Sequence, residues 1–248
     1  MVESTPLLSI KGLHKWFGKV HALNDINIDV FQGEVVGLLG DNGAGKSTLI
    51  KILAGVLQKD KGEIYWEGRK VEIKSVKEAR KLGIETVFQE RGLIENFSVS
   101  KNIFLGREPT TRFNLIDYKK MENESEKLME KLRLRIKSHQ EARFCSGGEK
   151  QGIIVSRAMY FKAKLVNLDE PTRALSIRGV EQVRSFVREL KKENIACIFV
   201  THNFEHVYPV ADRFIVMARG EAILNVEKRE VPSLHALEEL IINTIARV

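Results

Sequence analysis

Short apolar runs alternate along the chain with longer segments in which apolar residues recur every three or four positions. The short runs predict strands at 7–12, 26–30, 34–39, 63–66, 70–73, 84–88, 165–168, 195–201, 213–218 and 222–226. The helical spacing predicts helices at 47–54, 76–82, 177–193 and 234–245. Strands and helices that alternate in this way predict an α/β fold.

Local signals refine several of these boundaries. Glu67 and Gly68 lie between two strand-like runs and predict a hairpin turn. Ser75 followed by Glu78 predicts a capping box, and Gly83 predicts the end of that short helix. The helix at 177–193 places Val180, Val183, Val187 and Leu190 on one apolar face.

The middle of the chain differs from the rest. From about residue 98 to 140 there is little strand pattern, and four residues fall at helical spacing among charged ones: Tyr118, Met121, Leu128 and Leu132. This predicts a helical subdomain inserted into the α/β core. At the C-terminal end, Leu234, Leu237, Leu240, Ile241 and Ile245 predict an amphipathic helix whose apolar face docks on the core or on a partner.

Composition and charge narrow the class of protein. The 248 residues are 43% hydrophobic and 29% charged, as in ordinary globular proteins. No apolar run approaches the roughly 18–20 residues that cross a bilayer, and no signal-peptide pattern is found, so we expect a cytoplasmic protein. The net charge is +7, but the basic residues are scattered, and we expect no nucleic-acid partner. Cys145 and Cys197 have no spacing typical of a disulfide framework or zinc site.

A glycine-rich segment between a predicted strand and helix carries the first chemical signal. It matches the phosphate-loop pattern and comprises Gly40, Asp41, Asn42, Gly43, Ala44, Gly45, Lys46, Ser47 and Thr48. Backbone N–H groups and the helix N-terminus would surround the phosphates of ATP. We expect Lys46 to reach the β- and γ-phosphates, Ser47 to ligate Mg²⁺ and Thr48 to contact the α-phosphate region. An ordinary glycine-rich turn would not need lysine, serine and threonine in this register.

A second strand, at 165–168, ends in two carboxylates. Asp169 is expected to bind Mg²⁺, and Glu170 is expected to polarise the attacking water as the catalytic base. A solvated acidic pair at a strand end is the alternative, and the phosphate loop upstream disfavours it.

Cys145, Ser146, Gly147, Gly148 and Glu149 stand between these two elements. By itself, this segment is also a capping box for the following helix. Together with the other motifs it resembles the signature motif of the ABC ATPase family, usually Leu-Ser-Gly-Gly-Gln. The resemblance implies that Ser146 to Glu149 contact the γ-phosphate of ATP held by a second subunit.

Three further residues match positions of the family pattern. One follows the strand at 84–88, one follows the strand at 195–201, and one lies near the N-terminus. Gln89 resembles the glutamine that contacts Mg²⁺ or water, and His202 resembles the histidine that contacts the γ-phosphate. Phe17 matches the aromatic that stacks on adenine, with Trp16 as its competitor. The resemblance covers roughly residues 7 to 226.

The chain departs from the family pattern at three positions. Cys145 replaces leucine, and Glu149 replaces glutamine, so its carboxylate must point away from the phosphates. Ser176 stands where the D-loop usually has aspartate, which puts the contact between subunits in question more than hydrolysis.

The resemblance implies a single ABC ATPase domain over 1–248. This domain would have a catalytic α/β core with a mixed sheet (7–95 and 150–226), an N-terminal antiparallel β part, a helical subdomain with the signature motif (96–149) and a C-terminal helix (227–248). It implies a homodimer in the ATP-bound state, a membrane permease, indirectly an external sugar-binding protein, and a peripheral place on the cytoplasmic membrane face. The segments at 38–49 and 89–108 resemble the ATPases of sugar importers of the ribose, xylose and fructose type, and the single cassette resembles the fructose-type members most. Importers of branched-chain amino acids, exporters and non-transport ATPases acting on DNA, ribosomes or cluster assembly are the alternatives.

Overall fold

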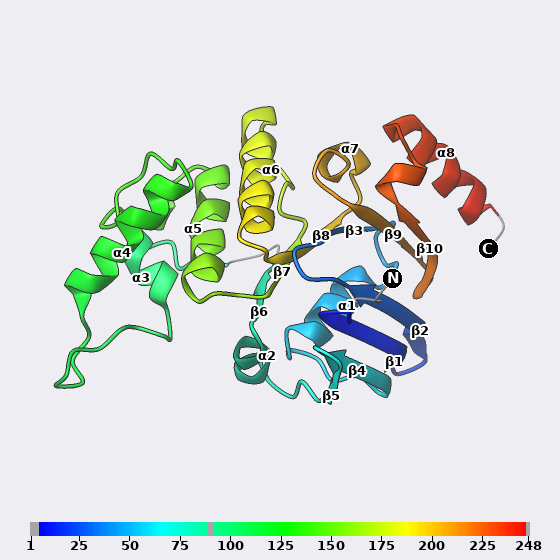
Figure 1. Ribbon diagram of the computed structural model, residues 1–248, viewed down its shortest axis with the longest axis horizontal. Coiled ribbons are helices and arrows are strands. Elements are labelled where there is room, and N and C mark those ends of the chain that lie inside the picture. Colours follow the sequence, from blue (N-terminus) through cyan, green and yellow to red (C-terminus); the bar gives the residue numbers. More distant parts are fainter. Residues whose placement is uncertain (1–4, 89–91, 247–248) are drawn as a thin grey trace.

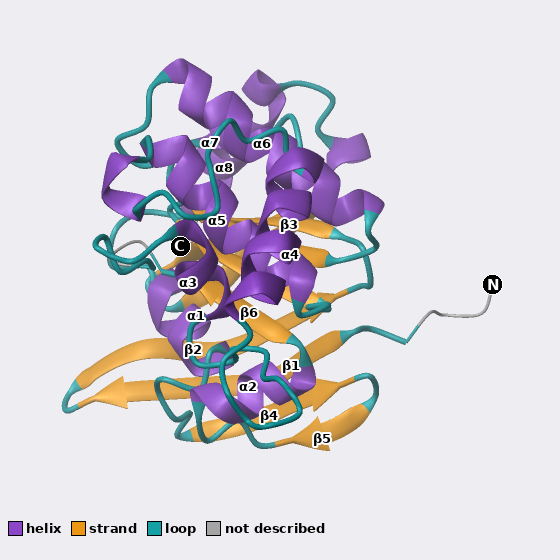
Figure 2. Ribbon diagram, turned by 90° about the vertical axis from the view of Figure 1, so that its left-hand side faces the viewer, coloured by secondary structure: helices purple, strands orange, loops and turns teal. Residues whose placement is uncertain are grey.

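The structure is a computed structural model that describes residues 5–88 and 92–246. Two sheets form its framework (Figures 1 and 2). The first is antiparallel, with the order β2-β1-β4-β5. Its strands are β1 (Leu8–Phe17), β2 (Val20–Val30), β4 (Lys61–Trp66) and β5 (Arg69–Val71). Glu67 and Gly68 both have positive φ in the turn between β4 and β5, as the predicted hairpin requires.

The second sheet is mixed, with the order β10-β9-β3-β8-β7-β6. Its strands are β3 (Val35–Leu39), β6 (Ile84–Val87), β7 (Leu165–Asp169), β8 (Ala196–Thr201), β9 (Arg213–Ala218) and β10 (Glu221–Glu227). β6, β7, β8, β3 and β9 run parallel, and β10 is antiparallel to β9. All residues of β3, β7 and β8 are buried, which explains their continuous apolar runs. The predicted α/β fold with a mixed and an antiparallel sheet is confirmed.

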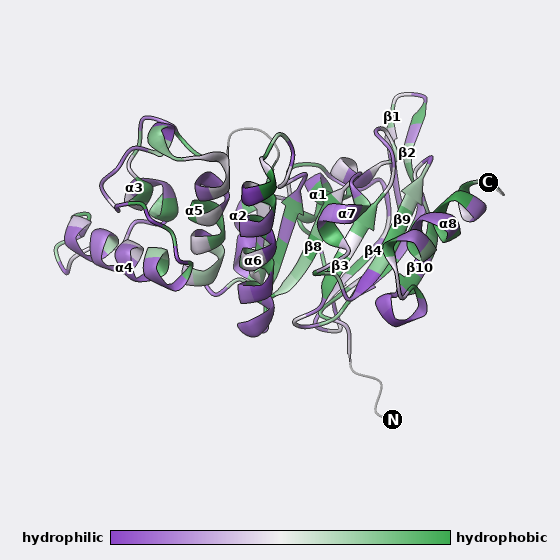
Figure 3. Cartoon of the chain, turned by 90° about the horizontal axis from the view of Figure 1, so that it is seen from above, coloured by the Kyte–Doolittle hydropathy of each residue, from purple (hydrophilic) through white to green (hydrophobic). Residues whose placement is uncertain are grey.

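Helices cover this framework on both sides of the second sheet. α1 (Lys46–Leu53) packs Leu49, Ile50 and Leu53 into a core shared by the two sheets. α2 (Val76–Leu82) follows β5, and α6 (Ile177–Lys192), α7 (Phe204–Val207) and α8 (Leu234–Ile245) lie over the other face of the mixed sheet (Figure 1). Figure 3 shows hydrophobic residues concentrated in the central strands and hydrophilic ones along α4 and α6.

A helical region projects from one end of the mixed sheet (Figure 1). It contains α3 (Val99–Phe104), α4 (Tyr118–Lys131), the short 3₁₀ turn η1 (Ala142–Phe144) and α5 (Gly147–Tyr160). Met121 and Leu132 are buried as their spacing predicts, but Tyr118 is 55% exposed because it occupies the first position of α4. α5 continues without a break past position 149, where the boundary between the helical subdomain and the core is expected.

Helix caps and the last helix follow the sequence closely. The Ser75 side chain accepts from the Glu78 amide, whereas the Glu78 carboxylate accepts from the Lys74 amide, so the expected reciprocal box is only half formed. The 3₁₀ turn η2 (Lys228–Glu230) precedes α8. Leu237 and Ile241 of α8 are buried in the core, which favours docking within the chain. Over the described residues, no helix combines the length and apolar character that a bilayer crossing demands.

Candidate nucleotide site

The phosphate loop leaves the end of β3 and enters α1 through a backbone that glycine alone fits well. Gly40 and Gly45 have φ of 141° and 102°. A Cβ at Gly40 would lie 2.1 Å from the Met217 carbonyl oxygen, and one at Gly45 would lie 2.6 Å from that of Ala22. Gly45 is the N-cap of α1 and offers no side-chain cap. The first amides of α1 therefore remain available to an anion.

Lys46 lies inside this loop with only 6% of its surface exposed. Its Nζ donates to the carbonyl oxygens of Gly40 at 2.6 Å and Asp41 at 2.9 Å. Burial lowers the pKa of the ammonium group, while the charges of Glu170 and Asp169 oppose that shift. The Lys46 ammonium is thus held inside the phosphate loop, where negative charge nearby favours its charged form.

Ser47 and Asp169 meet at the carboxyl ends of β3 and β7. The Ser47 hydroxyl donates to Oδ1 of Asp169 at 3.3 Å. Asp169 is 4% exposed, and burial raises the pKa of its carboxyl group. Paired hydroxyl and carboxylate oxygens suit Mg²⁺, which takes few protein ligands and completes its shell with phosphate and water. No cluster of three or more acidic, histidine or cysteine ligands occurs in the described part of the chain.

Glu170 and His202 follow the adjacent strands β7 and β8. The His202 ring nitrogen Nδ1 lies 2.8 Å from Glu170 Oε1, and the Thr201 hydroxyl donates to Oε2 at 3.4 Å. Glu170 has φ of 51°, an unusual value for a non-glycine residue and one that occurs at functional sites. The sheet thus brings both predicted catalytic side chains together.

Lys46, Ser47, Glu170 and His202 line one cavity of about 610 Å³, and Asp169 adjoins it through its hydrogen bond with Ser47. The wall includes phosphate-loop residues 42–48, Glu170 and His202. It also includes residues that sequence reasoning missed: Val20, His21, Ala22, Arg173, Arg219 and Gly220. These come from the start of β2, from the turn after β7 and from the turn between β9 and β10, which lie far apart in the sequence, so no single motif contains them.

The predicted adenine contact is less direct. Phe17 is 47% exposed but does not line this cavity; its strand neighbour Val20 does. Trp16 stacks on His21 with ring centroids 4.3 Å apart and planes 10° apart, so one face of its ring is already occupied. Gln89 lies outside the described residues.

The predicted signature segment has the geometry of a complete capping box. The Ser146 hydroxyl accepts from the Glu149 amide at 3.3 Å, and the Glu149 carboxylate accepts from the Ser146 amide at 2.7 Å. Ser146, Gly147, Gly148 and Glu149 line a different cavity, of about 880 Å³, between α5 and α6. Within one chain, this segment and the phosphate loop therefore do not share a cavity.

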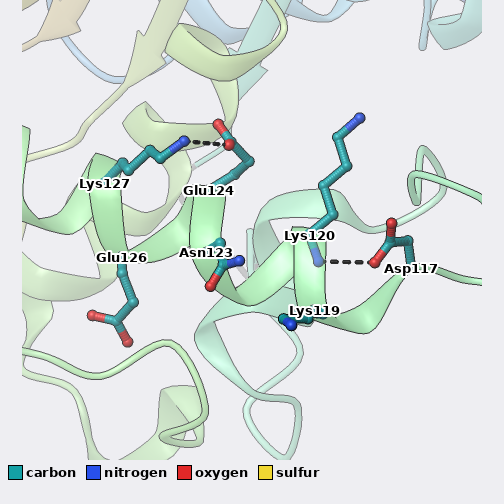
Figure 4. A pocket seen from close by; sticks show the side chains of 7 residues that line it. All are labelled: Asp117, Lys119, Lys120, Asn123, Glu124, Glu126 and Lys127. Carbon is teal, nitrogen blue, oxygen red and sulfur yellow. Dashed lines mark hydrogen bonds and ion pairs between the residues drawn. The ribbon is translucent and has the colours of Figure 1, made fainter.

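Another hollow lies over α4, away from these groups (Figure 4). Lys127 pairs with Glu124 at 2.7 Å, and the Lys120 amide donates to Asp117 at 2.9 Å. The side chains splay along one solvated helix face instead of converging, so we assign this hollow no site.

Comparison with known proteins places this geometry in context. The family described as "ABC transporter" matches residues 23–173. The xylose/arabinose import ATP-binding protein XylG of Sulfolobus acidocaldarius is 45% identical over 225 residues, which are 90% of this chain and 89% of that protein. The ribose import ATP-binding protein RbsA of Caldanaerobacter subterraneus is 38% identical over 226 residues, 91% of this chain but 46% of that protein. The chain thus spans under half the length of this second relative.

Solved structures agree with the fold. An ATP-binding cassette of an ABC transporter in its ADP conformation has a TM-score of 0.79 and 26% identity, over 95% of this chain and 98% of the other. The cbiO1 structure from Clostridium perfringens, part of an ABC transporter complex, has a TM-score of 0.79 and 27% identity, over 98% and 96%.

Proposed function

The chain belongs to the ABC transporter family and is an ATPase, and on this premise we propose that it powers import of a simple sugar through a separate membrane permease. The observation that carries the sugar assignment is the 45% identity to a xylose/arabinose import protein over nearly the full length of both chains. The ribose-type and galactofuranose-type relatives support the same substrate class.

In this proposal the cavity at the phosphate loop holds ATP. Lys46 and the first amides of α1 bind the β- and γ-phosphates, Thr48 contacts the α-phosphate region, and Phe17 stacks on adenine. Ser47, Asp169 and Gln89 hold Mg²⁺, which neutralises phosphate charge when bound. Glu170 orients and polarises the attacking water, and His202 contacts the γ-phosphate.

A second copy of the chain completes the site. Support comes from the separation of the two cavities, because the residues at the N-terminus of α5 (Ser146, Gly147, Gly148 and Glu149) line a cavity that does not include their own phosphate loop. The capping box engages the Ser146 hydroxyl and the amides of Ser146 and Glu149, so the Gly147 and Gly148 amides at this helix N-terminus are the groups proposed to bind a phosphate from the partner. ATP then joins the two copies, and hydrolysis lets them separate.

The remaining parts follow from this role. We assign 7–95 and 150–226 to the catalytic core, 96–149 to the helical subdomain and 227–248 to a C-terminal segment. The dimer binds the cytoplasmic side of a permease that receives sugar from an external binding protein.

A pull-down tests the transport role. The bait is tagged Glu170→Gln protein with ATP, added to native membranes, and the captured proteins are identified by mass spectrometry. Recovery of a multi-span permease together with a sugar-binding protein supports the proposal. Recovery of an amino-acid permease, ribosomes or cluster-assembly proteins instead would overturn the sugar assignment and leave the ATPase intact.

A further inference from the structure

Two arginines line the nucleotide cavity in addition to the residues that the family resemblance implies there. Arg173 is part of the D-loop segment that ends at Ser176. Arg173 lies three residues after Glu170, and Arg219 lies in the turn between β9 and β10. Since guanidinium groups bind phosphate oxygens through a planar fork of N–H donors, their presence in this cavity bears on how the nucleotide is held.

The two arginines occupy different sides of the cavity. Arg219 precedes Gly220, whose amide donates to the Ala44 carbonyl and whose carbonyl accepts from the Asn24 amide. Arg219 therefore belongs to the side formed by β2 and the back of the phosphate loop. Arg173 instead shares a turn with Glu170, because its amide donates to the Glu170 carbonyl at 3.1 Å.

The residues on either side of Arg173 hold its turn in place. Thr172 is 3% exposed, and its hydroxyl lies 3.0 Å from Nδ1 of His206 on α7. Ala174, the next residue after Arg173, has φ of 57°. A buried threonine before Arg173 and a left-handed residue after it hold this backbone on the cavity wall beside Glu170 and His202.

The negative charges at this side of the cavity favour a nearby cation such as the Arg173 guanidinium. Glu170 places a carboxylate there, and Asp169 adds a second one next to Ser47. The Lys46 ammonium is buried in the phosphate loop and donates to two carbonyl oxygens. The terminal phosphate of ATP would add further negative charge. An arginine keeps its full charge even near a partly dry site and can bind two phosphate oxygens at once.

We propose that Arg173 binds the terminal phosphate of ATP held by its own chain and stabilises the charge that develops there during hydrolysis. The inference rests on the assignment of this cavity to ATP and adds a residue to those that the family resemblance implies for the site. An arginine that contacts the γ-phosphate distinguishes ATP from ADP, because ADP has no γ-phosphate for the arginine to bind.

The test compares ATP and ADP affinities by isothermal titration calorimetry in the Glu170→Gln background. We expect Arg173→Ala to weaken ATP binding about tenfold, the size of one charge-assisted contact, and to leave ADP binding within about twofold. Arg173→Lys should recover part of the loss because it restores charge without the fork. Arg229→Ala, a change of the same charge at a side chain 80% exposed on η2, is the matched control and should alter neither affinity.

The outcomes separate this inference from the site assignment. Lys46→Ala should weaken both nucleotides; if it weakens neither, the cavity does not hold ATP and the proposed function fails at this point. If Lys46→Ala weakens both but Arg173→Ala affects ATP and ADP equally, or neither, the role of Arg173 is overturned. If Arg173→Ala weakens ATP binding only in dimeric protein, as judged by size-exclusion chromatography, then Arg173 does not bind the ATP held by its own chain.

A rate measurement adds a second readout. With Glu170 intact, Arg173→Ala should lower kcat for ATP by at least about tenfold, since arginines that stabilise a transferring phosphoryl group contribute factors of this size or more. An unchanged kcat would contradict the second half of the proposal.

Discussion

Oε1 of Glu170 lies 2.8 Å from Nδ1 of His202, so the predicted catalytic base contacts the histidine expected to bind the γ-phosphate. The second oxygen of Glu170 accepts from Thr201, the residue before His202. Both carboxylate oxygens thus bind groups at the end of β8, the strand that lies between β3 and β7. A water or γ-phosphate that reaches this carboxylate must share it with, or displace, the histidine.

Glu170→Gln should retain ATP binding and lose hydrolysis. An amide keeps the shape and the contact with His202 but cannot accept a proton, and the loss of a general base lowers rates by about 10²–10⁴-fold. Phosphate release measures the rate, and equilibrium titration measures binding. Glu205→Gln, the same change at an exposed glutamate on α7, is the control. Hydrolysis at the full rate by Glu170→Gln would refute the assignment of the base.

Asp169→Asn should stabilise the nucleotide-free protein at neutral pH while impairing hydrolysis. Burial raises the pKa of this carboxyl group, so the unfolded chain releases the proton at lower pH than the folded one. Stability therefore falls as pH rises from about 4, the ordinary aspartate value, through the folded pKa. The advantage of the asparagine variant should be full above that window and absent below it. Urea unfolding at a series of pH values measures the difference.

Asp60→Asn supplies the contrast for that experiment. The Trp16 amide and then the Lys15 side chain hold the pKa of the exposed Asp60 carboxyl below its usual range. Its contribution to stability is present above about pH 4 and is lost as the carboxylate is protonated. Asp60→Asn should therefore destabilise at neutral pH. Equal pH dependence of the two variants would contradict both arguments.

Ser176→Ala should lower the free energy of unfolding by about 1 kcal/mol, the usual cost of losing an N-cap. Ser176 caps α6, because its hydroxyl accepts from the Gly179 amide at 3.3 Å. Ser176→Asp should retain the stability, since serine and aspartate are similarly good N-caps. Chemical denaturation compares the three proteins. If Ser176→Asp is as unstable as Ser176→Ala, the serine does not replace aspartate as a cap.

Gly148→Ala should impair hydrolysis more than it impairs folding. A Cβ at this buried position would lie 2.3 Å from Oε1 of Gln182 on α6. The flexible glutamine can yield, so we expect a loss of about 1 kcal/mol, at the low end of overpacking effects. Gln182→Ala in the same protein should restore the stability. It should not restore the rate, because the added methyl group still covers the helix terminus. Recovery of both would mean that Gly148 serves packing alone.

The sequence predicts the phosphate loop and the buried strands because these depend on local pattern. Gly40 to Thr48 is contiguous, and β3, β7 and β8 are apolar at every position because both faces are covered. β1 and β2 extend further than their apolar cores suggest, since polar residues near Phe17 and Val20 pair across the hairpin. Strand pairing, and not side-chain hydrophobicity, decides these ends.

Residues brought together by turns could not be predicted in the same way. Arg173 and Arg219 reach one cavity from turns 46 positions apart in sequence (219 − 173), and nothing local marks either as a phosphate ligand. Trp16 is occupied by His21 because the β1–β2 register places them opposite each other. Such relationships follow from tertiary geometry and became apparent only with the fold.

The last helix has a practical consequence for any work with fused proteins. Ile241 and Ile245 of α8 share a cavity of about 320 Å³ with phosphate-loop residues 40–44. An affinity tag, a fluorescent reporter or an immobilising linker attached after this helix is therefore joined to an element that adjoins the phosphate loop. If such a fusion protein binds nucleotide more weakly, the attachment is the first cause to test.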